Sequence, residues 1–430
     1  MAYPKVTVQT VDNTTITPKN QEYKVFYAGV FDRGPVSEKT TIYSILDLKA
    51  TFGKYFSLNQ DEWMSIYNYF NYGNPSIDII RVVGSDSLTA SNIGGLKVLS
   101  EEDFDTLPKS KNIICASSPG GWGNGLKIKI QVKNDSLEFS TYLNNEFIES
   151  QTIEKSLPIE LKTDYFYAYL IDPQDAEYSL YGGLTTNPTT EQISNAYEEA
   201  NDEDTDYSFI LVNPNYEYCG VSLAEKKRAI AFANYKNSHI FSDFLIYYDG
   251  YKSQRCPFTG KTIRVPIVGD ILGMRAYLVN NEGIGVSHCR RTYSLDNIID
   301  FKVPKLEELY KNYVNSLGKS SSYFYPYSEV LSNGKNLTQQ LIFNTLSKEC
   351  EQGARYFIFE YNDDYTRNSF KKQITSILNE YKDSRYISNF QVTCDLSNQN
   401  SSEPNAMYLD IVYQQAGIVE DIKIRITAYN

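Results

Sequence analysis

The chain has 430 residues and a formal net charge of −12 at pH 7, with 41 Lys and Arg against 53 Asp and Glu. This length predicts roughly two to four domains with substantial cores, and the acidic balance argues against binding to nucleic acid or to an anionic membrane surface, since both reward clustered Lys and Arg. The sequence shows neither a basic leader followed by apolar residues nor a run of about 18 apolar residues, so we expect no export and no membrane insertion.

The N-terminal quarter is expected to form a β-α-α-β unit behind a lone strand. In residues 5–11, KVTVQTV, Val6 and Val8 alternate with polar residues, which is the period of a strand. The polar stretch 12–20 that follows offers this strand no local partner. The unit itself has a strand that ends at the turn Gly34-Pro35, helices over 44–53 and 61–73, and a strand over 77–84.

The middle of the chain changes from strands to alternating helices and strands. Strands are expected over 112–117, 126–134, 137–144 and 165–171. The pattern then alternates, which is typical of an α/β arrangement, with helices over 192–200 and 222–236 and strands over 207–214 and 241–249. Residues 263–285 predict a strand, a turn and a closely packed helix, and residues 316–336 are expected to be a linker.

The C-terminal quarter predicts one α/β sandwich and a second lone strand. Helices are expected over 336–353 and 366–383, and strands over 356–361, 390–396 and 407–414. In the final strand, 421–430, Ile422, Ile424 and Ile426 alternate with polar residues. Together the elements predict a multidomain fold of mixed α+β and α/β class.

Two glycine motifs resemble phosphate-binding loops but have the wrong context. A phosphate loop must open a helix, whereas the glycines of GGWGNG, residues 120–125, lead into an alternating strand. Gly260-Lys261-Thr262 has the ending of a Walker loop, but Arg255 stands where the first glycine belongs and a strand follows. We interpret the first motif as a structural turn and the second as a hairpin turn, and we expect no cofactor.

The sequence also contains no recognisable motif for catalysis or metal binding. Ser287, His288 and Cys289 are adjacent, and neighbours in a strand point to opposite faces, so we expect them not to converge on a nucleophile site. The six cysteines lie far apart and the chain has only two histidines, so we expect reduced thiols and no zinc site. The acidic run 198–206 lacks the spacing of a calcium loop. The 37 tyrosines suit surfaces that become interfaces.

Three blocks of sequence resemble the contractile tail sheath proteins of tailed bacteriophages, which are related to the sheaths of phage-tail-like bacteriocins and type VI secretion systems. The first block is AGVFDRGP with the later Phe52-Gly53 and IRVVG, and the second is PGGWGNGLKIKI. The third runs from NGKNLT through ARYFIFEYNDDYTR to FQVTCDLSNQN, MYLDIVY and EDIKIRI. Their order along the chain carries the resemblance.

The resemblance implies a non-enzymatic structural subunit that polymerises helically around a tail tube and contracts to drive the tube through a host envelope. Its implied partners are further copies in stacked, hexameric rings, the tube protein, and baseplate and terminator or neck proteins. The implied location is the tail of a virion, after assembly in the host cytoplasm. The alternatives are the sheath of a bacteriocin or type VI-like injection system and, more remotely, a cytosolic enzyme that uses the middle α/β region.

The resemblance also implies a division of the chain. Residues 1–20 and 421–430 would be terminal arms, 21–110 the N-terminal part of an inner domain, 331–420 its tube-facing C-terminal part, and 111–330 an outer domain that is β-rich over 111–180 and α/β over 181–315. The arms would add strands to neighbouring copies through Val6, Val8, Val11, Ile422, Ile424 and Ile426. We expect the helix over 366–383 to contact the tube through Arg367, Lys371 and Lys372, and the motif turns to be Arg33, Gly34, Pro35, Trp122, Gly123 and Asn124.

Overall fold

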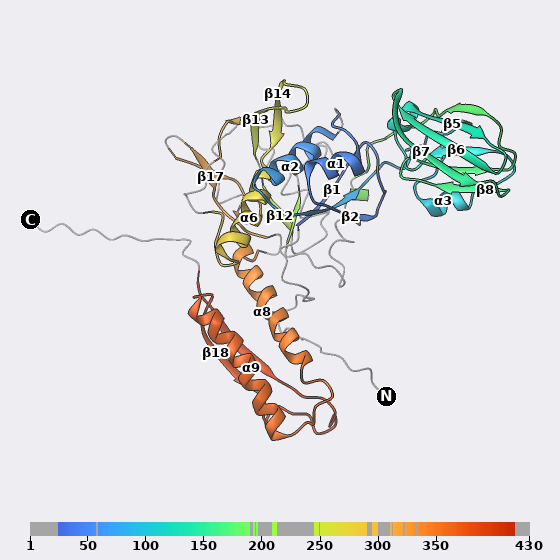
Figure 1. The fold of residues 1–430 in the computed structure, drawn as a ribbon. Coiled ribbons are helices and arrows are strands. Elements are labelled where there is room, and N and C mark those ends of the chain that lie inside the picture. The colour runs from blue at the N-terminus through green and yellow to red at the C-terminus, as the bar shows by residue number, and fades with distance from the viewer. Residues whose placement is uncertain are drawn as a thin grey trace, which may run out of the picture.

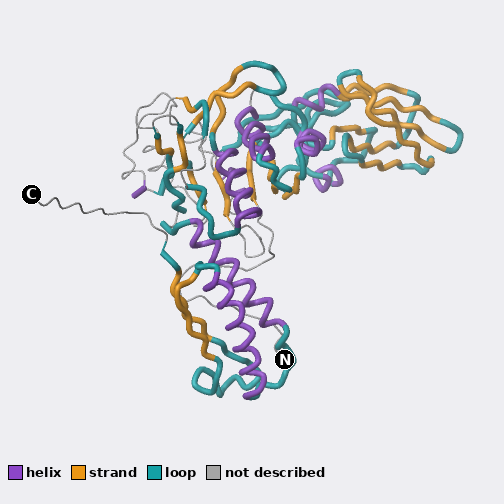
Figure 2. Tube along the Cα trace, turned by 60° about the vertical axis from the view of Figure 1, so that its left-hand side comes forward, coloured by secondary structure: helices purple, strands orange, loops and turns teal. Residues whose placement is uncertain are grey.

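The computed structural model describes residues 25–56, 59–189, 192–193, 195–196, 209–212, 245–248, 250–289, 295–299, 310–311, 313–320, 323–331 and 334–417. They form three parts: a central body, a β-sandwich that projects from one side of it, and an elongated C-terminal unit that extends away from it (Figures 1 and 2). The lone strands expected at 5–11 and 421–430, the helix at 222–236 and most of the helix at 192–200 lie outside the described residues.

The central body is built on a five-stranded sheet with strand order β12-β11-β1-β3-β2. Its strands are β1 (Val25–Gly29), β2 (Lys39–Ile42), β3 (Ile77–Arg81), β11 (Phe209–Val212) and β12 (Leu245–Tyr247). All neighbouring pairs are parallel except β2 with β3. Every residue of β1 and β3 is buried, as is typical of parallel strands covered on both faces.

This pairing crosses the domain boundary that we expected after residue 110. Strand β1 pairs with β3 on one side and with β11 on the other, so the middle of the chain completes the N-terminal sheet. The C-terminal unit has a hydrophobic core of its own. The mixed α and β class is confirmed, but the sheet of the N-terminal part takes its last two strands from the middle region rather than from the C-terminal part.

Among the described residues, the central body contains the helices α1 (Ile45–Phe52), α2 (Gln60–Asn71) and α6 (Val268–Glu282). The predicted helix α1 is confirmed, with the Ser44 side chain accepting a hydrogen bond from the Asp47 amide and Gly53, at φ 81°, ending the helix. Both α2 and α6 contribute to the main hydrophobic core. Within the described ranges, no helix combines the length and the apolar character that crossing a bilayer requires.

Helices α2 and α6 approach each other closely at Gly269. A Cβ atom there would lie 2.6 Å from the carbonyl carbon of Ser65 on α2. We therefore expect Gly269→Ala to lower the free energy of unfolding by about 1–3 kcal/mol, the usual cost of overpacking. Urea unfolding followed by circular dichroism would measure the change.

The matched control is Gly353→Ala on another helix, α8 (Leu337–Arg355), where the nearest atom to a new Cβ is Gln373 Nε2 at 3.3 Å. This variant should be neutral or more stable by up to about 1 kcal/mol, because Ala is the better helix former. Equal effects of the two substitutions would contradict the close approach.

Two small sheets complete the central body. Strands β13 (Tyr251–Arg255) and β14 (Thr262–Pro266) form the expected hairpin around Gly260, at φ 69°, and β15 (Ile298–Ile299) pairs with β13. The prediction of a linker over 316–336 is wrong, because β16 (Leu317–Lys319) and β17 (Phe324–Pro326) pair as antiparallel strands there. The side chains of Leu317 and Tyr325 in these strands are buried. The stabilisation from this burial outweighs the preference of the surrounding polar residues for a turn or linker.

The β-sandwich comprises two antiparallel sheets, β10-β5-β6-β7 and β4-β9-β8. Its strands are β4 (Ile113–Ala116), β5 (Leu126–Val132), β6 (Ser136–Leu143), β7 (Glu146–Glu154), β8 (Ile159–Lys162), β9 (Phe166–Leu170) and β10 (Ala176–Ser179), with the short helix α3 (Glu101–Asp105) before them. Residues from both sheets share one core. The segments that enter and leave the β-sandwich lie side by side, since the Gly84 amide donates to the Thr186 carbonyl at 3.0 Å.

The C-terminal unit consists of α8, α9 (Asp364–Asp383) and the antiparallel pair β18 (Ile387–Thr393) and β19 (Asp410–Gln415). Helix α8 connects two cores, with Leu337 and Leu341 in the central body and Leu346 in the C-terminal unit. The strand expected over 356–361 is wrong: this segment is the turn between α8 and α9. Its aromatic residues favour a strand only where a neighbouring strand and a core face are available, and here the chain reverses direction between two helices.

Candidate functional site

The predicted motif turns meet where the β-sandwich joins the central body. Arg81, at the end of β3, is fully buried. Its Nε donates to the Phe31 carbonyl at 3.0 Å and its Nη1 to that of Gly34 at 2.8 Å, while its Nη2 donates to the carbonyls of Asp32 and Pro119 at 3.2 and 2.7 Å. Burial lowers the pKa of Arg81 to about 9, so the guanidinium stays charged at pH 7. One side chain thus fastens β3, the loop after β1 and the β-sandwich together.

Arg33 and Gly34 contact the β-sandwich directly. The Arg33 guanidinium lies over the rings of Trp122 and Tyr165, 5.5 and 4.9 Å from their centroids. The Gly34 amide donates to Ser118 Oγ at 3.1 Å, and its φ of 101° is one that favours glycine. Pro35, the next residue, is partly exposed.

The Trp-Gly-Asn turn is held from inside the β-sandwich. Asn124 donates from Nδ2 to the Gly183 carbonyl at 2.9 Å and accepts from the Gly183 amide at 2.8 Å. A Cβ at Gly123 would lie 2.9 Å from the Cβ atoms of Ala90 and Ala116, so only glycine fits without a shift of the neighbours. The geometry makes these turns a joint between two parts of the chain, and the glycines lead into β5, as expected of a structural turn.

In the part of the chain that the structure describes, the β18–β19 sheet has two open edges. Among the described residues these two strands pair only with each other. In β19, Ile411 and Tyr413 pack toward the core of the C-terminal unit, whereas Val412 between them is exposed. An isolated two-stranded sheet is marginally stable, so this sheet depends on packing against α9. Its outer edges have no strand partner among the described residues, and such edges expose backbone groups that can pair.

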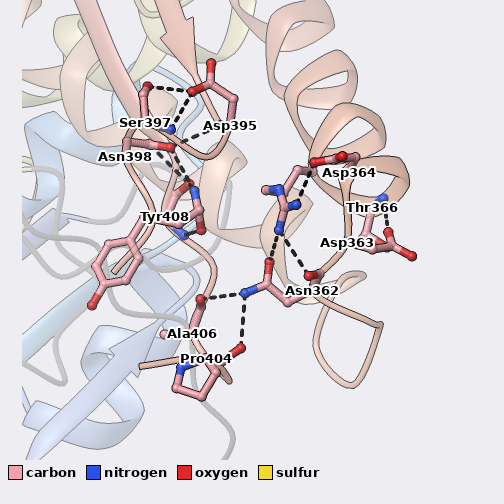
Figure 3. A network of polar contacts seen from close by, with 12 residues as sticks. Asn362, Asp363, Asp364, Thr366, Asp395, Ser397, Asn398, Pro404, Ala406 and Tyr408 are labelled. Atoms are coloured by element: carbon pink, nitrogen blue, oxygen red, sulfur yellow. Dashed lines mark hydrogen bonds and ion pairs between the residues drawn. The ribbon is translucent and has the colours of Figure 1, made fainter. Parts of the chain in front are cut away.

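A polar network holds the far end of the C-terminal unit (Figure 3). Arg367 donates from Nη1 to Asn362 Oδ1 at 2.6 Å, and its Nη2 lies 2.6 Å from Asp364 Oδ1. Asn362 in turn donates to the carbonyls of Pro404 and Ala406 at 3.2 and 3.0 Å. The network therefore joins the turn after α8 to the loop between β18 and β19.

A second part of this network starts from Asn398. Its Nδ2 donates to the Thr393 carbonyl at 3.0 Å. Its Oδ1 accepts from the Asp395 amide at 3.1 Å (Figure 3). Hydrogen bonds from Ser397 lower the pKa of Asp395 below its usual value. The loop after β18 is thus locked by its own side chains.

The expected tube-contact residues have different environments. The Arg367 side chain is 8% exposed and engaged in the network, so its position argues against a role in touching a partner. Lys372 is exposed and Lys371 partly exposed on α9. The turn after α8 and the start of α9 present an unexpected set of exposed aromatic side chains, 78–89% accessible: Tyr356, Phe359, Tyr361 and Tyr365.

His288 and Cys289 converge with Glu329, contrary to our expectation. The expectation assumed a strand, but both residues lie in a turn after α6, where neighbours can face the same space. One ligand atom from each of the three residues lies within 4.8 Å of the others. Residue spacing alone could not reveal this cluster, because Glu329 lies in a separate segment after β17.

The six expected arm residues, Val6, Val8, Val11, Ile422, Ile424 and Ile426, lie outside the described residues. Their role stays a prediction.

Known proteins match the chain in sequence and in fold. Residues 336–428 match the family model of the phage tail sheath C-terminal domain. The tail sheath protein of Vibrio phage KVP40 is 27% identical over 184 residues, which covers 39% of this chain and 26% of that protein. The chain therefore spans about a quarter of the length of this curated relative.

The fold is similar to that of solved sheath proteins over almost the whole chain. The sheath tail protein of Listeria innocua superimposes with a TM-score of 0.61 at 14% identity, covering 94% of each chain. That of Desulfitobacterium hafniense has a TM-score of 0.54 at 15% identity, covering 97% of this chain and 99% of the other. The anti-feeding prophage helical sheath in its contracted state has a TM-score of 0.53 at 10% identity, covering 99% of each chain. The resemblance seen in the sequence is confirmed: residues 336–428 match the phage tail sheath C-terminal domain, and the whole chain has a fold similar to that of solved tail sheath proteins.

Proposed function

We propose that this chain is the structural subunit of a contractile tail sheath, which polymerises helically around a tail tube and contracts to drive the tube through a host envelope. The observation that carries the proposal is the β18–β19 sheet, which lies in the matched C-terminal domain and has both outer edges open among the described residues. Open edges pair readily with strands from other chains.

The terminal segments are the proposed occupants of these edges. Residues 5–11 and 421–428 have the alternation of half-buried strands. A strand added beside β19 would place its apolar side chains next to Ile411 and Tyr413, which face the core of the C-terminal unit. About four inter-strand hydrogen bonds per arm would contribute roughly 2–6 kcal/mol per contact. Arms of this kind keep subunits tied while the rings rotate and slide.

Contraction requires two sets of contacts between subunits, with the extended state metastable. The mostly polar connection at residues 12–20 would let the strand contacts persist while other contacts change. The C-terminal unit would face the tube with Lys371, Lys372 and the aromatic turn 356–361, because this end of the molecule combines exposed cations with exposed aromatic rings. The β-sandwich, which projects away from the C-terminal unit, would lie outward (Figure 1).

The division into domains is proposed in revised form. Residues 87–187 form the outward β-sandwich, because the chain enters and leaves it at the Gly84–Thr186 hydrogen bond. Residues 25–86 join the described residues between 188 and 331 in one central body, since β1 pairs with both β3 and β11. The C-terminal unit follows from residue 334.

The proposed partners are further copies of the chain in hexameric rings, the tube protein, and baseplate and terminator or neck proteins. The proposed location is the tail of a virion, or of a phage-tail-like particle, assembled in the host cytoplasm. The contracted anti-feeding prophage sheath has a similar fold, which keeps an injection system other than a phage as the second candidate. An enzyme using the middle region is the remote alternative.

Electron microscopy of the purified chain tests the proposal. We expect hollow striated tubes whose yield rises with protein concentration, because each subunit links to several others. A single small oligomer at every concentration would contradict sheath function and favour the enzyme alternative.

A further inference from the structure

The cluster of His288, Cys289 and Glu329 brings three different ligand atoms to one buried place. His288 and the Glu329 side chain are almost completely buried. The imidazole nitrogens, the thiol sulfur and the carboxylate oxygens offer one atom each within 4.8 Å of the others. These three ligand types together are those that zinc uses in proteins.

The hydrogen bonds of Tyr248 decide which His288 nitrogen is free. The Tyr248 hydroxyl donates its single proton to the Ser328 carbonyl at 2.5 Å. It must therefore accept from His288 Nε2, also at 2.5 Å, so Nε2 carries the hydrogen. In a neutral ring this leaves a lone pair on Nδ1, and Nδ1 faces Glu329 Oε2 at 3.3 Å.

Two acceptors that face each other in a buried place need a proton or a metal cation between them. Nδ1 of His288 and both carboxylate oxygens of Glu329 lack hydrogen-bond partners among the described residues. Among the described residues, the buried cation nearby is Arg275, and it directs its terminal nitrogens to the carbonyls of Val286 and Ile284 instead. An unpaired buried carboxylate costs several kcal/mol, so the arrangement calls for a positive ligand.

We propose that His288 Nδ1, Cys289 Sγ and the Glu329 carboxylate bind a divalent cation of the zinc type, with water at the fourth position. A thiolate and a carboxylate would balance the two positive charges of the ion. Tyr248 completes the site by fixing the orientation of the imidazole, as the outer hydrogen bond of a metal-binding histidine does. This revises the expectation, drawn from the cysteine spacing and the presence of only two histidines, that the chain has no zinc site.

The ion would brace the base of the C-terminal unit. His288 and Cys289 follow α6 of the central body, and the Glu329 carbonyl accepts from the amide of Leu337, the first residue of α8, at 2.9 Å. Asn315 holds the same segment through two hydrogen bonds of 2.8 Å with the Val330 backbone. The site is therefore structural, and its presence does not depend on the proposed sheath function.

Metal analysis of the purified full chain tests the site. After incubation with zinc and dialysis into metal-free buffer, we expect inductively coupled plasma mass spectrometry to find about one zinc ion per chain. Exchange for Co²⁺ should give a sulfur-to-cobalt charge-transfer absorption, which Cys289→Ser removes. The matched control Cys350→Ser, at a partly buried cysteine on α8, should leave both results unchanged.

Tyr248→Phe keeps all three ligands and should weaken zinc binding by about 10- to 100-fold. This variant also keeps the test decisive if Cys289→Ser does not fold. A chain that retains no zinc after dialysis, or a charge-transfer band that persists in folded Cys289→Ser, would overturn the proposal and leave a buried histidine–carboxyl pair in its place.

Discussion

Deletion of residues 1–20 should abolish tube formation while leaving the subunit folded. The deletion removes a segment with the alternation of a strand, which we propose pairs with an open edge of the β18–β19 sheet in a neighbouring copy. Losing roughly 2–6 kcal/mol at every link lowers each association constant by about 30- to 10⁴-fold. Because each ring repeats the contact, the effect multiplies along the tube. Electron microscopy and sedimentation of equal protein concentrations would measure it.

The matched control replaces residues 12–20 with a Gly- and Ser-rich sequence of the same length. This change keeps the strand 5–11 and its reach, so tubes should still form. A complementary variant, Val8→Pro within the full chain, removes one backbone donor and should behave like the deletion. Undiminished tube yield from the deletion would show that the N-terminal arm is not the link.

Arg81→Met should cause the largest loss of stability of any single substitution considered for this chain. The substitution leaves the carbonyls of Phe31, Asp32, Gly34 and Pro119 without their buried donor. Removing one partner of a buried charged interaction costs about 3–5 kcal/mol. Urea unfolding would show this as a lower midpoint, and limited proteolysis should cut sooner between the central body and the β-sandwich.

Two other arginines provide the comparison. Arg355→Met removes an exposed pair with Glu351 on the same helix and should change stability by less than about 0.5 kcal/mol. Arg33→Met removes the ring contacts with Trp122 and Tyr165 and should cost about 1 kcal/mol. If Arg81→Met were no more harmful than Arg355→Met, the joint would not depend on this guanidinium.

The elements with a regular apolar period could be predicted from the sequence. In α9, Phe370, Ile374, Leu378 and Tyr381 recur at helical spacing and line the core of the C-terminal unit. In β5, Leu126, Ile128 and Ile130 alternate with exposed or partly exposed lysines and glutamine. Local signals of this kind determine one element at a time, so the predicted helices α1, α2, α6, α8 and α9 are all present.

The elements that depend on distant partners could not be predicted. Strand β7, EFIESQTIE, is polar and mostly exposed, and only its pairing with β6 makes it a strand. The central sheet joins β1 to β11, far along the chain, and nothing in either segment specifies that register. The segment 356–361 has the composition of a strand but no strand beside it among the described residues.

Only part of the candidate site could be predicted, because contacts between distant segments leave no local pattern in the sequence. The motif turns were recognised as structural, yet their common contact, Arg81, lies within the IRVVG block and its role appears only when four carbonyls meet it. Arg367 was recognised by its place in the chain, but its partners Asn362 and Asp364 turn it inward. His288 and Cys289 converge with Glu329 only because the chain turns after α6. The spacing of the residues in the sequence does not predict this turn.

The most direct measurement is a cryo-electron microscopy map of the assembled tubes at a resolution that traces the backbone. We predict that residues 5–11 and 421–428 of neighbouring copies lie as added strands along the outer edges of β18 and β19. If both segments instead pair within their own subunit while the edges of β18 and β19 face solvent, the account of how the sheath is linked would be wrong.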